Sequence, residues 1–181
     1  MIKKVGVLSL MLLLFLCSCG IKSIPKQYTE VESSWTDLEK QFVKRSNIVP
    51  RMALVVRSHA ASEKEILGAA MMSRAYAVQN KIGARDLNEE NVKKIQTAEE
   101  QLAKAASKLV ATADKYPSLK TDTKFKDLNT QLESAEKDIQ IAKVKYAQEA
   151  EKFNDLIGSF PTNLTNRLFF HHQKKGTFAL R

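Results

Sequence analysis

The sequence predicts an all-α protein, an antiparallel bundle of long helices with heptad-type packing. Its 181 residues include only 6 glycines and 4 prolines, fewer turn-forming residues than a sandwich, barrel or doubly wound sheet requires. Hydrophobic residues make up 44% of the chain and charged residues 27%, a balance typical of one globular domain with its own core. Apolar side chains also recur at helical spacing along most of the chain.

Residues 1–18 have the pattern of a lipoprotein signal peptide. Lys3 and Lys4 precede an apolar run, Val5 to Leu16, which has the length of an export signal and is short for a membrane span. The following Leu-Cys-Ser-Cys19 resembles the lipobox of bacterial lipoproteins, in which the thiol of the final cysteine is acylated before cleavage. We therefore expect lipidation at Cys19. The alternatives are an ordinary signal peptide, or an uncleaved anchor, with a chance cysteine.

Lipidation would have two consequences for the mature chain. No thiol would remain for a disulfide, a cysteine metal site or a cysteine nucleophile, and the acyl chains would tether the protein rather than let it span the bilayer.

Removal of the signal peptide, with Lys3 and Lys4, leaves 27 basic against 20 acidic residues, a net charge of about +7. Because the protein is exported, nucleic acid is the least favoured partner for this excess of positive charge. We expect a membrane-anchored bacterial protein on the periplasmic or extracytoplasmic side. The residue after Cys19 is Gly20 rather than the Asp that retains lipoproteins in the inner membrane of enteric bacteria, which favours the outer membrane if the cell has one.

The first part of the mature chain predicts a tether and two helices. Residues 19–28 lack apolar periodicity and contain Pro25, which suggests an extended lipidated tether. Val31, Trp35, Leu38 and Phe42 then follow at helical spacing. Ser46-Asn47 before Pro50 predicts that the first helix ends here and a new helix begins, so we expect a second helix over 49–81. Residues available for its buried side are Met52, Val56, Ala60, Leu67, Ala70 and Ala77.

The second half of the chain predicts two sharper helices, about 89–115 and 122–157. Tyr116-Pro117 ends the first, since proline cannot continue the ladder of hydrogen bonds. Its heptad rows are Ile95, Leu102, Leu109 and Tyr116, with Ala98, Ala105 and Thr112. The rows of the second are Phe125, Leu132, Ile139, Tyr146, Phe153 and Phe160, with Leu128, Ala135, Ala142 and Leu156. Glu149 interrupts these rows. Three interpretations of this position are open: part of a functional pocket, a polar contact that sets the register of the helices, or fraying of the apolar stripe.

An ordered series of residues resembles the signature of the LemA family. The series covers about residues 29–180 and consists of Arg45-Ser-Asn-Ile-Val-Pro50, Tyr116-Pro-Ser-Leu119, Phe125, Leu128, Leu132, Glu136, Tyr146, Phe153-Asn154 and Phe160-Pro161. The resemblance implies a long-helix bundle held at a membrane by its N-terminus, in a family without an established activity. Ala147, Lys143 and Arg51 depart from the family's usual Asn, Arg and Asn. If those polar residues form a ligand site, this chain has altered it.

The sequence offers little that suggests catalysis. His59 and Glu63 are four residues apart but lack the HExxH pattern, and we expect the neighbouring His171 and His172 to be solvent-exposed tail residues. There is no phosphate-binding glycine loop, no GxSxG elbow and no cleft between carboxylate pairs such as Glu133 and Glu136. We therefore predict that the protein is not an enzyme and uses no cofactor and no metal.

A basic, aromatic C-terminal tail, residues 167–181, is the best candidate for binding a partner. It contains no acidic residue, and its candidate contacts are Arg167, Phe169, Phe170, Lys174, Lys175 and Phe178. Aromatic anchors among cations suit a partner protein or an anionic lipid surface. Alternatively, the phenylalanines cap the open end of the bundle while the cations stay in solvent.

The sequence thus predicts a membrane-tethered binding or scaffold lipoprotein whose helical bundle occupies residues 29–166. We expect the membrane, through the lipid anchor, and an envelope protein as partners, with no nucleic acid and no small-molecule substrate. The alternatives are an envelope enzyme or small-ligand binder with a polar pocket near Glu149, and a membrane-surface module that acts through the basic tail.

Overall fold

The computed structural model describes the backbone of residues 2–79 and 82–179, and the side chains of residues 21–79 and 82–179. In this part of the chain every regular element is helical, so the fold is all-α. The elements are α1 (Ile2–His59), α2 (Lys64–Gln79), a 3₁₀ turn η1 (Ala84–Asp86), α3 (Glu89–Thr112), α4 (Pro117–Thr121), α5 (Thr123–Gly158), α6 (Thr162–Thr165) and a single-turn π-helix η2 (Asn166–Phe170).

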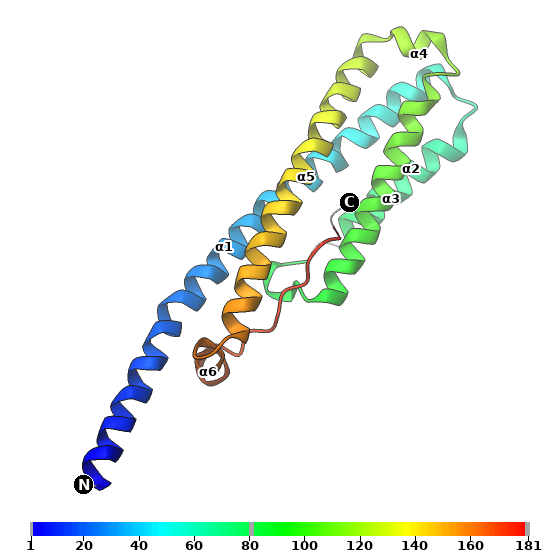
Figure 1. Ribbon diagram of the computed structural model, residues 1–181. Helices are drawn as coiled ribbons and strands as arrows, with labels where there is room; N and C mark the ends of the chain where they lie inside the picture. The colour runs from blue at the N-terminus through cyan, green and yellow to red at the C-terminus, as the bar shows by residue number, and fades with distance from the viewer. Residues whose placement is uncertain (1, 80–81, 180–181) are drawn as a thin grey trace.

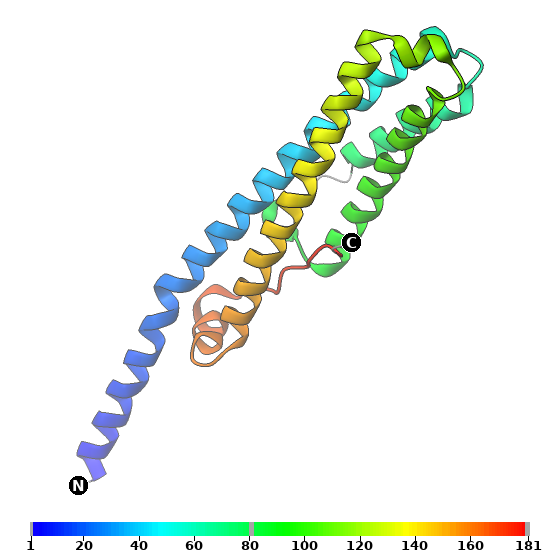
Figure 2. The ribbon, with the colours of Figure 1, turned by 45° about the horizontal axis from the view of Figure 1, so that its top comes forward.

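The molecule is elongated and organised around two long helices (Figure 1). α1 and α5 lie side by side and run in opposite directions, while α2 and α3 pack against the C-terminal half of α1. The turned view keeps this arrangement and shows α6 beside α1, at the end from which the N-terminal part of α1 projects (Figure 2). Among the described residues, no helix has an apolar stretch long enough to cross a membrane.

The expected break at Ser46-Asn47-Pro50 does not occur. α1 continues through Pro50 to His59, and the chain turns at residues 60–63 instead. A proline inside a helix leaves the carbonyl four residues earlier without its N–H partner. Here the Ser46 carbonyl accepts a hydrogen bond from Arg74 Nε of α2, at 3.0 Å. A side chain from another helix therefore compensates for the missing donor.

The expected extended tether is also wrong for residues 20–27, which are helical and continue α1. Ile24 is fully buried in the apolar core. Gln27 Nε2 donates to Glu149 Oε2 of α5 at 2.7 Å. Packing against α5 explains why this segment is ordered despite Pro25.

The predictions for α3 and α5 are confirmed closely. Asn88 and Asp122 cap their N-termini through side-chain oxygens that accept from Asn91 N and Phe125 N. The heptad residues within these helices are buried, apart from the half-buried Leu156. Phe160, the last residue of the expected row, lies beyond α5 and has 72% of its surface exposed. α5 ends at Gly158, so the chain leaves the helical path before it reaches Phe160.

Candidate functional site

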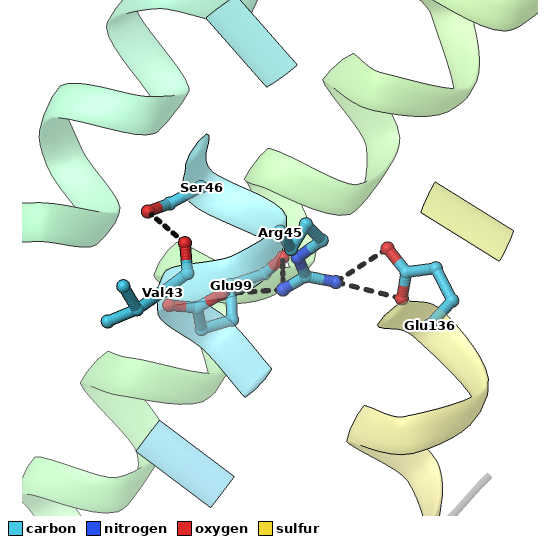
Figure 3. A network of polar contacts seen from close by, with 5 residues as sticks. All are labelled: Val43, Arg45, Ser46, Glu99 and Glu136. Carbon is cyan, nitrogen blue, oxygen red and sulfur yellow. Dashed lines mark hydrogen bonds and ion pairs between the residues drawn. The ribbon is translucent and has the colours of Figure 1, made fainter. Parts of the chain in front are cut away.

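A buried ionic centre joins α1, α3 and α5 (Figure 3). Arg45 Nη1 donates to both carboxylate oxygens of Glu136 at 2.9 Å, and Arg45 Nη2 donates to Glu99 Oε2 at 2.5 Å and to the Glu99 carbonyl at 2.9 Å. The side chains of Arg45 and Glu99 are only 3% and 7% exposed, against 34% for Glu136. The planar guanidinium suits this forked geometry better than an ammonium would.

This ionic centre separates two apolar clusters. On α1, Phe42 belongs to one cluster and Ile48 to the other, with Arg45 between them. Glu99 holds the same position between Ile95 and Leu102 on α3. Three charged groups therefore meet where the two halves of the core adjoin, a place where an unpaired charge would be costly.

Burial perturbs the acid–base properties of the ionic centre. Loss of hydration raises the pKa of Glu99, and the neighbouring Arg45 opposes that rise. Lys143 of α5 is half-buried nearby, where desolvation and then the charge of Arg45 lower its pKa. Its ammonium lies 5.5 Å from the centre of the Phe178 ring. The site thus holds two cations and two carboxylates at close quarters.

A polar groove opens beside the ionic centre, with a volume of about 450 Å³. Its walls carry both signs of charge and come from α1, α3, α5 and the C-terminal segment. The lining residues are Arg45, Glu99, Glu100, Ala103, Lys104, Ser107, Lys108, Glu136, Gln140, Lys143 and Ala179. We call this the polar groove; its buried end is fixed by the Arg45 ion pairs and its outer end by exposed lysines.

The C-terminal segment, residues 171–179, is docked on the helices rather than free. Asn154 of α5 forms a paired contact with Lys175, in which its Nδ2 donates to the Lys175 carbonyl at 2.8 Å and its Oδ1 accepts from Lys175 N at 2.7 Å. Tyr146 Oη donates to the Gly176 carbonyl at 2.9 Å, and Gly176 N donates to the Leu87 carbonyl at 2.8 Å. The segment therefore links α5 to the start of α3.

Two of the six expected partner-binding residues are buried, which corrects that prediction for Lys175 and Phe178. Lys175 Nζ donates to the carbonyls of Ala84 and Arg85 at 2.8 and 3.1 Å, and burial lowers its pKa. Phe178 is 3% exposed and stacks on Trp35, with ring centres 6.3 Å apart. The alternative of core-capping phenylalanines therefore holds for Phe178.

The other four residues of that set differ in their accessibility. Arg167, Phe169 and Lys174 are exposed, and Phe169 keeps 60% of its surface in solvent. Phe170 is half-buried and stacks on His172, with ring centres 5.8 Å apart. Exposed and buried members thus lie on one short stretch of chain, and only Arg167, Phe169 and Lys174 remain available to a partner.

Glu149 is half-buried and already paired. Its carboxylate accepts from Lys152 Nζ at 2.8 Å and from Gln27 Nε2 at 2.7 Å. These hydrogen bonds, that of Lys152 first, lower the pKa of Glu149. The contact with Gln27 joins α5 to α1, which favours the register-setting interpretation among the three alternatives.

His59 lies in an arrangement that superficially resembles a hydrolase triad. Its Nε2 is 3.1 Å from Asp122 Oδ2, and its Nδ1 is 3.3 Å from Ser118 Oγ. The Asp122 carboxylate also accepts from Phe125 N, a bond that is the main cause of its lowered pKa. Ser118 is exposed, without the enclosed substrate site that a serine nucleophile needs. We interpret the contact as a cap that links the ends of α1 and α5; Glu63 instead accepts from Tyr116 Oη.

Two further predictions concern lipidation and metal binding. Cys19 lies outside the residues whose side chains are described, so its lipidation stays a prediction. Within the described residues, no group of three His, Cys, Asp or Glu side chains is placed to hold a metal ion.

Comparison with known protein families matches residues 34–181 to the LemA family. The chain belongs to the LemA family. A search of curated proteins finds no significant match. The match includes the whole ionic centre, the polar groove and the docked C-terminal segment.

The residues that carry the LemA signature mostly hold this fold together. Arg45 and Glu136 pair in the ionic centre, and Tyr146 and Asn154 fix the C-terminal segment. Of the three departures, Lys143 lines the polar groove, Ala147 is buried and Arg51 is exposed.

Sequence reasoning missed Glu99, although a signal was present. Glu99 lies four residues after Ile95 and three before Leu102, so it shares their buried helix face. A charged residue at that spacing indicates a partner from another helix.

Proposed function

We propose that this LemA-family chain is a membrane-tethered helical scaffold of the bacterial cell envelope, anchored through lipidated Cys19, which binds an envelope protein through the polar groove. The observation that carries the binding part is the open groove itself, about 450 Å³ in volume and lined by charges of both signs. Polar grooves of mixed charge suit a partner with complementary charges, since these steer encounter and fix register.

The arrangement of the helices supports a scaffold role. We propose an antiparallel bundle with heptad-type packing, in support of which the buried rows of α3 and α5 repeat every seven residues. The ionic centre and the docked C-terminal segment close this bundle at two levels. Such a rod holds a binding surface at a defined place relative to the membrane.

The alternative of an enzyme or small-ligand binder near Glu149 has less support. Its carboxylate is occupied by Gln27 and Lys152, and its pKa is lowered rather than raised. A general acid in a cleft would be expected to have a raised pKa. Recognition at the polar groove therefore explains the geometry better.

The anchor is tested by metabolic labelling with a fatty-acid analogue in bacteria. We expect Cys19→Ser to abolish labelling and to leave an unprocessed precursor, whereas the matched variant Cys17→Ser keeps both labelling and processing. Labelling that persists in Cys19→Ser, or that is lost equally in both variants, would contradict anchoring at Cys19.

The partner-binding part is tested by a photo-reactive residue placed in the polar groove of the full chain. We expect Ser107, which lines the groove on α3, to give a discrete crosslinked protein in cells. Exposed Ser58, near the end of α1, is the matched control position. The same products at both positions, or none at Ser107, would remove the groove from the proposal.

A further inference from the structure

We propose that an apolar patch at one end of the molecule docks on the interface of the lipid bilayer and so holds the tethered protein against the membrane. The patch consists of Phe160, Leu164, Leu168 and Phe169, and we call it the end patch. The inference rests on the proposed anchoring at Cys19, and it assigns a surface that the proposed function leaves without a role.

The end patch is unusually exposed for its composition. Phe160 is 72% exposed, Leu168 57%, Phe169 60% and Leu164 36%. Single exposed apolar residues are ordinary, but a group of large ones within ten residues marks an interaction surface. All four belong to the short segment between the end of α5 and the docked C-terminal segment, where the α6 and η2 turns lie at the end of the packed helices, beside the projecting part of α1 (Figure 1).

The position of the patch relative to the anchor points to the membrane as its occupant. α6 lies against α1 at the end from which the N-terminal part of α1 projects (Figures 1 and 2). Ile24 is buried there, and Cys19 precedes it by five residues, about 7.5 Å along a helix. A lipid on Cys19 would therefore place the membrane surface within about two helical turns of the packed end.

The charges at this end complement an anionic lipid surface. Asp155, near the end of α5, is an exposed acidic residue at this end, and no acidic residue follows it in the sequence. Lys22 and Lys26 of α1, with Arg167 and Lys174, are exposed cations. Cations beside aromatic and leucine side chains are the composition of interfacial segments, in which the rings enter the headgroup region and the charges meet anionic lipids.

A bilayer explains the patch better than a protein partner would. A tethered protein keeps this end beside lipid at all times, so the apolar surface is covered without a second molecule. The polar groove, in contrast, lies farther along α3 and α5 and stays free. The two surfaces therefore have separate roles.

The test uses the full-length protein, purified with its lipid and reconstituted in protein-free vesicles of phosphatidylethanolamine and phosphatidylglycerol. Trp35 is the chain's single tryptophan, so Trp35→Phe gives a silent background. Phe169→Trp then reports on the end patch, and Leu54→Trp, at a position 59% exposed on α1, is the matched control far from that end. Brominated lipids quench tryptophan only where it contacts acyl chains, and melting curves check that each variant is folded.

We expect Phe169→Trp to show a blue shift and a loss of emission in brominated vesicles, and Leu54→Trp to show neither. Vesicle flotation of the wild type against Cys19→Ser tests the anchor separately. Flotation that depends on Cys19, without quenching at position 169, would overturn the end patch and leave the anchor intact, as expected if the patch serves a protein instead. If Cys19→Ser floats as well as the wild type and the tryptophan at position 169 is still quenched, the result would support the end patch and refute the anchor. Flotation of neither chain would overturn both.

Discussion

Gly176 allows the most direct test of the docked C-terminal segment. A Cβ at this position would lie 2.7 Å from Glu89 Cα and 2.8 Å from the Asn88 carbonyl oxygen. Both are backbone atoms in the first turn of α3, so neither can rotate away. Gly176→Ala must therefore push the segment off α3, although no unusual backbone conformation is involved.

The expected loss follows from the contacts at this position. The hydrogen bonds from Gly176 N to the Leu87 carbonyl and from Tyr146 Oη to the Gly176 carbonyl would both lengthen or break, at about 1 kcal/mol each. Release of the buried Phe178 ring would add up to about 3 kcal/mol. A total of about 2–5 kcal/mol corresponds to a fall in Tm of about 4–20 °C for a chain of this size.

Thermal unfolding followed by circular dichroism measures this loss, and Trp35 fluorescence reports on the segment because Phe178 stacks on that ring. Gly68→Ala is the matched control. Gly68 is exposed inside α2 with no atom within 4 Å of a new Cβ, so alanine should stabilise the helix by about 0.5–1 kcal/mol. Equal effects of the two substitutions, or an unchanged Tm for Gly176→Ala, would refute the docking of the segment.

Three further predictions concern the ionic centre, α1 and pH. Arg45→Met should cost about 3–5 kcal/mol in unfolding free energy, since it leaves the Glu99 carboxylate buried and unpaired; adding Glu99→Leu should recover most of it. Arg74→Met should cost about 1–2 kcal/mol, because it removes the donor to a buried carbonyl of α1; Pro50→Ala, which restores an N–H, should reduce that cost. Burial lowers the pKa of His172 below its ordinary 6.5, so stability should fall as the pH drops below about 6.5.

Each of these predictions has a control and a contradicting result. For the ionic centre, a single Arg45→Met variant as stable as the double variant would show that Glu99 does not need its partner. For α1, equal costs of Arg74→Met with and without Pro50→Ala would remove the compensation argument. For pH, the folded state binds fewer protons at His172 than the unfolded state, so the acid loss should disappear in His172→Phe and persist in a variant of the exposed His171; the same acid loss in all three chains would contradict it.

The helices that were predicted well are those with local signals. α3 and α5 have capping residues at their starts and long heptad rows, and both features act over distances of a few residues. α1 was divided wrongly because Pro50 is a strong local breaker. Its compensation comes from Arg74 of another helix, 28 residues after the carbonyl it caps, which no local pattern contains.

The same distinction explains the candidate site. The sequence singled out Arg45 and Glu136 but did not pair them, and Glu99 was missed, because the pairing joins residues 54 and 91 positions apart. The C-terminal cations and aromatics looked like one exposed tail by composition. Lys175 is nevertheless buried, since its ammonium finds two carbonyls about 90 residues earlier in the chain. Composition cannot reveal a partner of that kind.

Where the LemA signature lies in the structure affects what membership of the family implies. Arg45 and Glu136 close the ionic centre, while Tyr146 and Asn154 hold the C-terminal segment. These contacts are within the chain, so these four signature residues help to close the fold. Three of the four end-patch residues, Leu164, Leu168 and Phe169, and most of the polar groove lie outside the signature. Specific recognition by this protein should therefore depend on surface residues that the signature leaves free, such as Lys104 and Ser107, and substitutions there should change binding without changing stability.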